Sequence, residues 1–154
     1  AIRTAVEQLA RCCGEPLCAE GDEVFLFPTP EQLCGLTEAQ LTGCGLGYRT
    51  RYIQHAAAQA AARTLDLDAL AVLPDNALFS RLLTLDGVGK KVANCVCLFG
   101  YGRTAMAPID VWIQRLIDEE FGGRDPFPAY GQQAGIVQQY LFYYKRSIST
   151  QKKC

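Results

Sequence analysis

The chain has 154 residues, of which 49% are hydrophobic and 20% charged, a composition sufficient for one globular domain with a buried core. No run of about 18 uninterrupted apolar residues and no signal peptide occur, so we expect no membrane span and an intracellular protein. The net charge of −1 argues against strong non-specific electrostatic binding of the whole protein surface to nucleic acid.

Apolar residues at helical spacing predict an all-α fold of about seven helices. One strand is conceivable at residues 23–28, and no internal repeat is visible. The chain starts without Met, and its first residues already have helical periodicity, so we expect it to be part of a longer protein. In chain order, the predicted helices cover residues 4–13, 29–45, 48–70, 75–87, 90–102, 108–123 and 134–146.

The charges are unevenly distributed. Residues 1–80 carry five Arg and no Lys against ten acidic residues, whereas residues 81–115 carry five basic residues against two acidic ones. Residues 145–154 add four more cations. A local basic region suits moderate binding to a phosphate backbone, but an ordinary solvated surface explains the charge alone equally well.

The cysteines do not form a recognisable metal-binding pattern. No C-x-x-C pair is present and His55 is the only histidine, so we expect neither a zinc site nor an iron–sulfur cluster. In a chain long enough to fold without disulfides, we expect most cysteines to be small buried apolar residues. The eight are Cys12, Cys13, Cys18, Cys34, Cys44, Cys95, Cys97 and Cys154.

The segment "LDGVGKKVANCVCLFG" predicts two helices joined by a tight turn. Gly87 and Gly89 allow backbone angles that other residues resist, and they leave the first amides of the second helix accessible to a phosphate. We expect that helix to bury Val92, Cys95, Val96 and Phe99. A nucleotide-binding P-loop is excluded, because it requires G-x-x-x-x-G-K-[ST] after a strand.

Lys90, Lys91 and Asp110 are candidate functional residues. Lys90 suits a phosphate contact or, more ordinarily, a solvated surface. The charged form of Lys91 is disfavoured by the helix dipole and by Lys90, which would supply a neutral, nucleophilic amine, although most lysines at helix starts are only tolerated. In "APIDVWIQR", Asp110 is expected to cap a helix, and its carboxylate could also stabilise a developing positive charge.

These segments resemble the helix-hairpin-helix motif, the Gly/Pro-rich loop and the Asp of the helix-hairpin-helix DNA glycosylase superfamily, and among its members the 8-oxoguanine DNA glycosylases most. "GCGLGYRTRYI" and "AGIVQQYLFYYKR" extend the resemblance over nearly the whole chain. It implies one helical glycosylase domain over residues 1–154, in which residues 75–115 form the hairpin, the loop and the Asp. The family's N-terminal β-domain and an asparagine-rich turn would precede Ala1.

The resemblance also implies a mechanism. Lys91 would attack the anomeric carbon of an oxidised guanine nucleotide and form a Schiff base, after which β-elimination nicks the strand. Asp110 would stabilise the sugar cation. The flipped base would lie between Cys95 and Phe142 while the Gln138 amide reads its polar edge. Core packing for Cys95 and Phe142, and an exposed polar position for Gln138, are the ordinary alternatives.

Further family positions would contact the DNA. Tyr48 would fill the space that the base leaves, and Arg49 would bind the orphaned cytosine, although surface aromatics and cations are common. The backbone would be held by Gly87, Val88, Gly89, Lys90 and Trp112. No cofactor is implied, apart from a structural metal ion shared by the hairpin carbonyls and a phosphate.

Two departures from the family pattern and two alternative functions remain. Trp112 stands where familiar eukaryotic members have histidine, and Asn94 where they have an acidic residue.

The expected partner is duplex DNA containing oxidised guanine, bound by a monomer. A monofunctional glycosylase for another base would not need Lys91, and a catalytically silent helix-hairpin-helix module would leave Lys91, Asp110, Gln138 and Phe142 unexplained.

Overall fold

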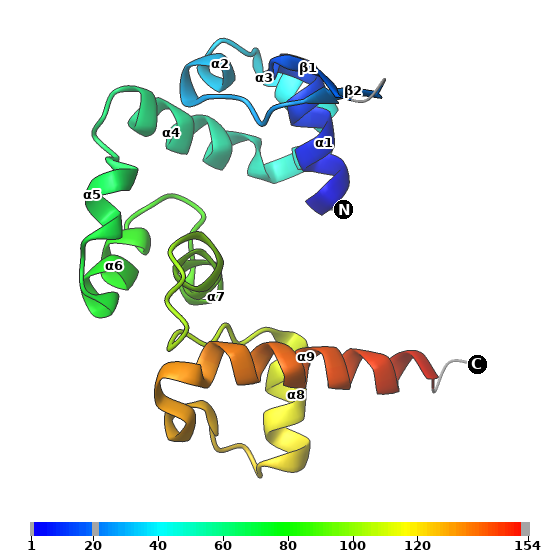
Figure 1. Cartoon of the computed structure of the whole chain (residues 1–154), viewed down its shortest axis with the longest axis vertical. Helices are drawn as coiled ribbons and strands as arrows, with labels where there is room; N and C mark the ends of the chain where they lie inside the picture. The colour runs from blue at the N-terminus through cyan, green and yellow to red at the C-terminus, as the bar shows by residue number, and fades with distance from the viewer. Residues whose placement is uncertain (1, 20–21, 152–154) are drawn as a thin grey trace. The chain divides into compact units, whose positions relative to one another are not determined.

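The structure is a computed structural model that describes residues 2–19 and 22–151. It divides into two compact units, Ala1–Ala69 and Leu70–Cys154. Figure 1 shows that both units consist almost entirely of helices, which confirms the all-α prediction. Among the described residues, no helix combines the length and apolar character needed to cross a membrane.

The first unit starts with helix α1 (Ile2–Cys13), followed by a small antiparallel hairpin of strands β1 (Pro16–Ala19) and β2 (Asp22–Phe25). The expected strand at residues 23–28 is therefore shorter than predicted. Its partner β1 was missed, because four residues are too few to show an alternating pattern. Figure 1 shows this hairpin near α1.

The predicted helix at residues 29–45 is wrong, because two short helices replace it. Helix α2 (Pro30–Cys34) and helix α3 (Glu38–Leu41) each start with a capping box, Thr29 with Gln32 and Thr37 with Gln40. In each box the threonine hydroxyl accepts a hydrogen bond from the glutamine amide, and the glutamine side chain accepts one from the threonine N–H. The second box restarts the helix after Gly35.

The predicted helix at residues 48–70 also divides into two. Helix α4 (Thr50–Ala61) ends just before Arg63, whose φ of 56° is left-handed. Helix α5 (Leu67–Ala71) starts where the Asp66 carboxylate accepts hydrogen bonds from the amides of residues 68 and 69. The core of the first unit is apolar and consists of Leu9, Leu33, Leu41, Cys44, Leu46 and Ala57.

The second unit contains the segments of interest for function. Helix α6 (Asp75–Leu82) is followed by α7 (Lys90–Cys95), which continues into a π-helical turn (Val96–Gly100). Helix α8 (Val111–Glu120) packs against α9 (Ala134–Gln151), and a 3-10 segment (Phe127–Gln133) connects them. The Lys145 ammonium of α9 lies 2.5 Å from the Glu119 carboxylate of α8. The core beside α8 consists of Ile113, Ile117, Phe127 and Ala134.

Candidate active site

The predicted hairpin between α6 and α7 is present, but only one of its two glycines has an unusual backbone. Gly87 has φ of 77°, which favours glycine, and the Val88 amide donates to the Leu85 carbonyl at 3.1 Å. Gly89 has an ordinary extended backbone and caps α7 without a side-chain hydrogen bond. A Cβ at Gly89 would meet nothing within 4 Å, so the surface of the turn is open there.

The burial predicted for α7 is wrong at both ends. The side chains of Val92 and Phe99 are 40% and 62% exposed, and Cys95 and Val96 are only partly buried. The fully buried residues of this segment are Ala93 and Cys97. A π-helical turn contains more residues than an α-helical turn, so the predicted spacing fails beyond Val96.

Asp110 caps α8 as predicted. Its Oδ1 atom accepts hydrogen bonds from the amides of Trp112 at 3.0 Å and Ile113 at 2.9 Å. These bonds hold the carboxylate at the start of the helix, where the helix dipole favours a negative charge.

A cavity of about 130 Å³ brings together residues from α7, the loop before α8, and α9. Five of the predicted site residues line it, namely Lys91, Cys95, Asp110, Gln138 and Phe142. The sequence analysis missed the remaining lining residues Phe99, Pro108 and Gln139. The spacing of residues 91, 95 and 99, which places them on one helical face, could have revealed Phe99.

Gln138 is a buried polar residue at this cavity, with only 2% of its surface exposed. Its Oε1 atom accepts a hydrogen bond from the Gln139 side-chain amide at 2.5 Å. The exposed position considered as an alternative is therefore excluded. Phe142 is partly buried against the α8 core, and the Arg146 guanidinium lies 5.6 Å from its ring centroid.

A second cavity, of about 520 Å³ and largely open to solvent, also has Lys91 and Asp110 in its lining. Its other lining residues are Ile109, Val111, Gln114 and Arg115. Trp112 lines neither cavity, and its ring lies 5.5 Å from the Arg115 guanidinium. Lys90 is exposed and also lines neither cavity.

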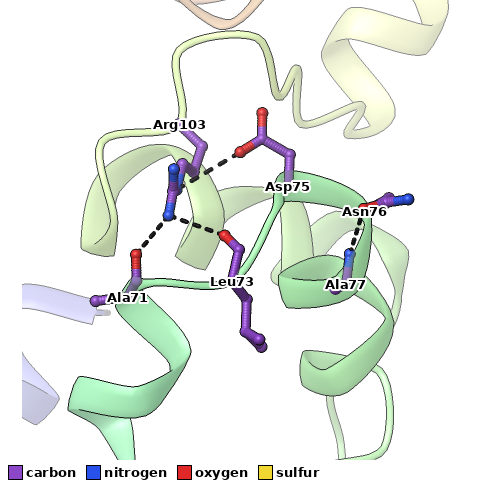
Figure 2. Close-up of polar contacts among 6 residues, drawn as sticks. All are labelled: Ala71, Leu73, Asp75, Asn76, Ala77 and Arg103. Atoms are coloured by element: carbon purple, nitrogen blue, oxygen red, sulfur yellow. Dashed lines mark hydrogen bonds and ion pairs between the residues drawn. The ribbon is translucent and has the colours of Figure 1, made fainter.

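Arg103 belongs to the segment between α7 and Asp110, and Figure 2 shows its polar contacts. Its Nη2 atom donates to the carbonyls of Ala71 at 2.6 Å and Leu73 at 3.1 Å, and its Nε atom lies 3.6 Å from the Asp75 carboxylate. The Arg103 amide also donates to the Cys97 carbonyl at 2.9 Å. Asp75 does not cap α6, because Pro74 occupies the cap position and the Asp75 carboxylate pairs with Arg103.

Replacing Arg103 with Met is expected to lower the free energy of unfolding by about 2 kcal/mol, because hydrogen bonds to a charged group are lost at two carbonyls. Urea denaturation checks this value. Arg103→Lys should restore only part of the loss, since one ammonium does not reproduce the planar guanidinium fork. A Met variant as stable as the original chain would contradict this account.

Gly135, at the start of α9, packs against the same loop. Its amide donates to the Thr104 carbonyl at 2.8 Å. A Cβ at this position would lie 2.4 Å from the Met106 carbonyl oxygen and 2.8 Å from a Leu98 methyl carbon, so a side chain does not fit. The loop before Asp110 and the helix that carries Gln138 are therefore held in direct contact.

Tyr48 and Arg49 belong to the first unit and lie in a 3-10 turn (Gly47–Arg49) just before α4. Tyr48 is 70% exposed, and the Arg49 guanidinium lies 4.6 Å from its ring centroid. The Tyr48 ring also meets the Tyr52 ring edge to face, with centroids 6.3 Å apart. Both predicted contact residues are thus on the surface, where a ligand can reach them.

The cysteines differ from the prediction that most are buried. Cys44 and Cys97 are buried, whereas Cys12, Cys18 and Cys34 are exposed, and Cys154 lies outside the described residues. Burial raises the pKa of the Cys97 thiol, and the nearby Asp75 carboxylate raises it further. Within the described ranges, no group of three His, Cys, Asp or Glu residues is arranged to hold a metal ion.

Comparisons with known proteins identify the family of this chain. Residues 1–130 match the family model described as HhH-GPD superfamily base excision DNA repair protein. A protein of Methanothermobacter thermautotrophicus named "Probable N-glycosylase/DNA lyase" is 29% identical over 170 residues, which cover 92% of this chain and 54% of that protein.

Two solved structures have the same fold. The structure of MBOgg1 with a low-affinity DNA ligand is 32% identical, with a TM-score of 0.88. The Clostridium acetobutylicum 8-oxoguanine glycosylase/lyase, in complex with double-stranded DNA containing cytosine opposite 8-oxoG, is 27% identical, also with a TM-score of 0.88. Each match covers 96% of this chain and 54% of the other, so the chain spans about half the length of these relatives. The family match extends over most of the sequence, and the chain belongs to the HhH-GPD superfamily of base excision DNA repair proteins.

Proposed function

We propose that the chain is the helical catalytic part of a bifunctional DNA glycosylase, which excises 8-oxoguanine from duplex DNA and then nicks the strand as an AP lyase. The observation that carries the proposal is the cavity lined by Lys91, Asp110, Cys95, Gln138 and Phe142. A potential nucleophile, a carboxylate and a base-sized set of aromatic, thiol and amide groups converge there. The names of the N-glycosylase/DNA lyase relative and of the 8-oxoguanine glycosylase structure support the same activity.

In this proposal Lys91 attacks the anomeric carbon of the damaged nucleotide. The bond between that carbon and the base breaks, its electron pair leaves with the base, and the base takes up a proton. The Asp110 carboxylate, held by the α8 amides, stabilises the positive charge that develops on the sugar. The amine and the anomeric carbon then form a Schiff base, and the sugar ring opens.

The lyase step follows from the same intermediate. Loss of a proton from the sugar C2′ atom breaks the bond between C3′ and its phosphate oxygen, and the phosphate leaves as the 5′ end of the downstream strand. Water then hydrolyses the Schiff base and regenerates the Lys91 amine. Both catalytic side chains come from one chain, so a monomer suffices for the reaction.

The hairpin between α6 and α7 is proposed to bind the DNA backbone. Gly89 has neither an unusual φ nor a neighbouring atom that requires glycine, so the open space beside it is suited to close approach by a phosphate. Lys90 adds a cation, and hairpin carbonyls could share a metal ion with that phosphate. Tyr48 and Arg49 of the first unit would contact the DNA itself, Tyr48 in the space that the flipped base leaves and Arg49 at the orphaned cytosine.

Borohydride trapping tests the proposed chemistry. The chain is incubated with a duplex that carries one 8-oxoguanine opposite cytosine, and sodium borohydride reduces any Schiff base to a stable adduct. The proposal predicts a covalent adduct and a nicked strand. Base release without an adduct would instead indicate a monofunctional glycosylase, and DNA binding without either product would indicate a silent binding module.

Replacing Gln138 with Ala is expected to reduce the preference for 8-oxoguanine over guanine by about tenfold, because the buried amide would no longer bind the polar edge of the base. Single-turnover excision rates on the two substrates measure the preference. Gln133→Ala serves as the control, because Gln133 is an exposed glutamine of the same unit that lines neither cavity. Equal selectivity in the original chain and the Gln138 variant would refute the proposed role.

A further inference from the structure

The two cavities of the second unit share Lys91 and Asp110 and none of their other lining residues. The smaller cavity has the aromatic, thiol and amide groups, and the larger one has two aliphatic side chains, an amide and a guanidinium. The reactive pair therefore lies where the two cavities meet.

The two cavities suit the two parts of one nucleotide, with its glycosidic bond located where they meet. This interpretation rests on the proposed function. The anomeric carbon has to lie beside Lys91 and Asp110, with the base on one side and the sugar-phosphate on the other. If the base occupies the smaller cavity, the deoxyribose and a flanking phosphate extend into the larger one. Ile109 and Val111 provide an apolar wall there for the carbon face of the sugar.

Arg115 is the cation of the larger cavity besides Lys91, and its surroundings leave its charge available. Within the described part of the chain, the Arg115 guanidinium has no carboxylate partner and contacts the Trp112 ring at 5.5 Å. The two acidic residues one turn further along α8 are already engaged, Asp118 with the Gln114 amide and Glu119 with Lys145.

We propose that Arg115 binds the phosphate diester that flanks the excised nucleotide, and that the Trp112 ring supports the guanidinium in this position. Stacking on an indole restricts the long arginine side chain without neutralising its charge. A guanidinium is also well suited to bind two phosphate oxygens at once. Trp112 therefore contributes to DNA binding through Arg115.

A double-mutant cycle between protein and DNA tests this contact. The probe is a duplex with one tetrahydrofuran abasic site, whose flanking phosphates are replaced by neutral methylphosphonates one at a time. Arg115→Gln is expected to weaken binding of the unmodified abasic duplex about tenfold. It should also lower the slope of log affinity against log salt by about one. At one flanking position the methylphosphonate should cause no further loss in this variant.

Arg124→Gln is the matched control, because Arg124 is an exposed arginine of the same unit that lines neither cavity. It should leave binding of the abasic duplex within about twofold, which is a small change in free energy. Trp112→Ala should show part of the Arg115→Gln loss, and Arg115→Lys should retain part of the affinity.

Additive losses from Arg115→Gln and each methylphosphonate would overturn the Arg115 contact while leaving the proposed enzyme intact. Equal losses in the Arg115 and Arg124 variants would do the same. If the unaltered chain neither traps on 8-oxoguanine DNA nor prefers the abasic duplex over undamaged DNA, both the contact and the proposed function fail.

Discussion

Replacing Lys91 with Gln is expected to lower base release and strand nicking by at least about 10³-fold, because the proposed nucleophile is lost. The glutamine side chain has no amine and forms no Schiff base, so the borohydride adduct should disappear as well. Affinity for the lesion duplex should change little, since the hairpin and the rest of the cavity remain. Single-turnover excision and trapping assays measure the first two effects, and fluorescence anisotropy measures the third.

Lys90→Gln is the control for the Lys91 variant. The two lysines are adjacent at the start of α7, but only Lys91 lines the cavities. The Lys90 variant should bind DNA more weakly, especially at low salt, and should still form the adduct. Persistent trapping by Lys91→Gln would show that another amine is the nucleophile and would overturn the proposed mechanism.

Replacing Asp110 with Asn is expected to slow base release by roughly 10²-fold or more, because the negative charge proposed to stabilise the sugar cation is removed. The folded state should be little affected, since an asparagine oxygen can still accept the two hydrogen bonds at the start of α8. Single-turnover excision and thermal unfolding check the two parts of this prediction.

Asp110→Ala separates the capping role from the chemical role. It should show the same loss of activity as Asp110→Asn and, in addition, a loss of about 1 kcal/mol in the free energy of unfolding, because the cap is removed. If Asp110→Asn retains full activity while Asp110→Ala loses it, Asp110 acts only through the helix start.

The parts of the site that could be predicted from sequence are those fixed by local rules. Gly87 indicates the turn, because its left-handed backbone favours glycine, and Asp110 indicates the start of α8, because carboxylates cap helices. The grouping of Gln138 and Phe142 with Lys91 is a different case. Residues so distant in sequence could be placed together only through the resemblance to a known family.

Other features could not be predicted because non-local packing or local hydrogen bonds outweigh the periodicity. The π-helical turn after Cys95 leaves Phe99 exposed, although the apolar spacing predicts its burial. The hydrogen bonds between Thr37 and Gln40 start a new helix within a segment whose apolar spacing predicts one continuous helix. An Asp at the start of a helical pattern, such as Asp75, is typical of a helix cap. Its carboxylate instead forms an ion pair with Arg103, 28 residues later in the chain.

The close packing at Gly135 limits how this protein can change over evolution. Any side chain there would displace the main chain around residues 104–106, which leads to Asp110, and would tilt the start of the helix that carries Gln138. A change in the proposed lesion specificity is therefore easier to acquire by exchanging side chains that line the cavity than by changing the backbone around it. Homologous proteins that carry a larger residue at this position should have a different backbone conformation in the loop before the Asp. A comparison of sequences identifies the homologues whose loop structure is to be determined.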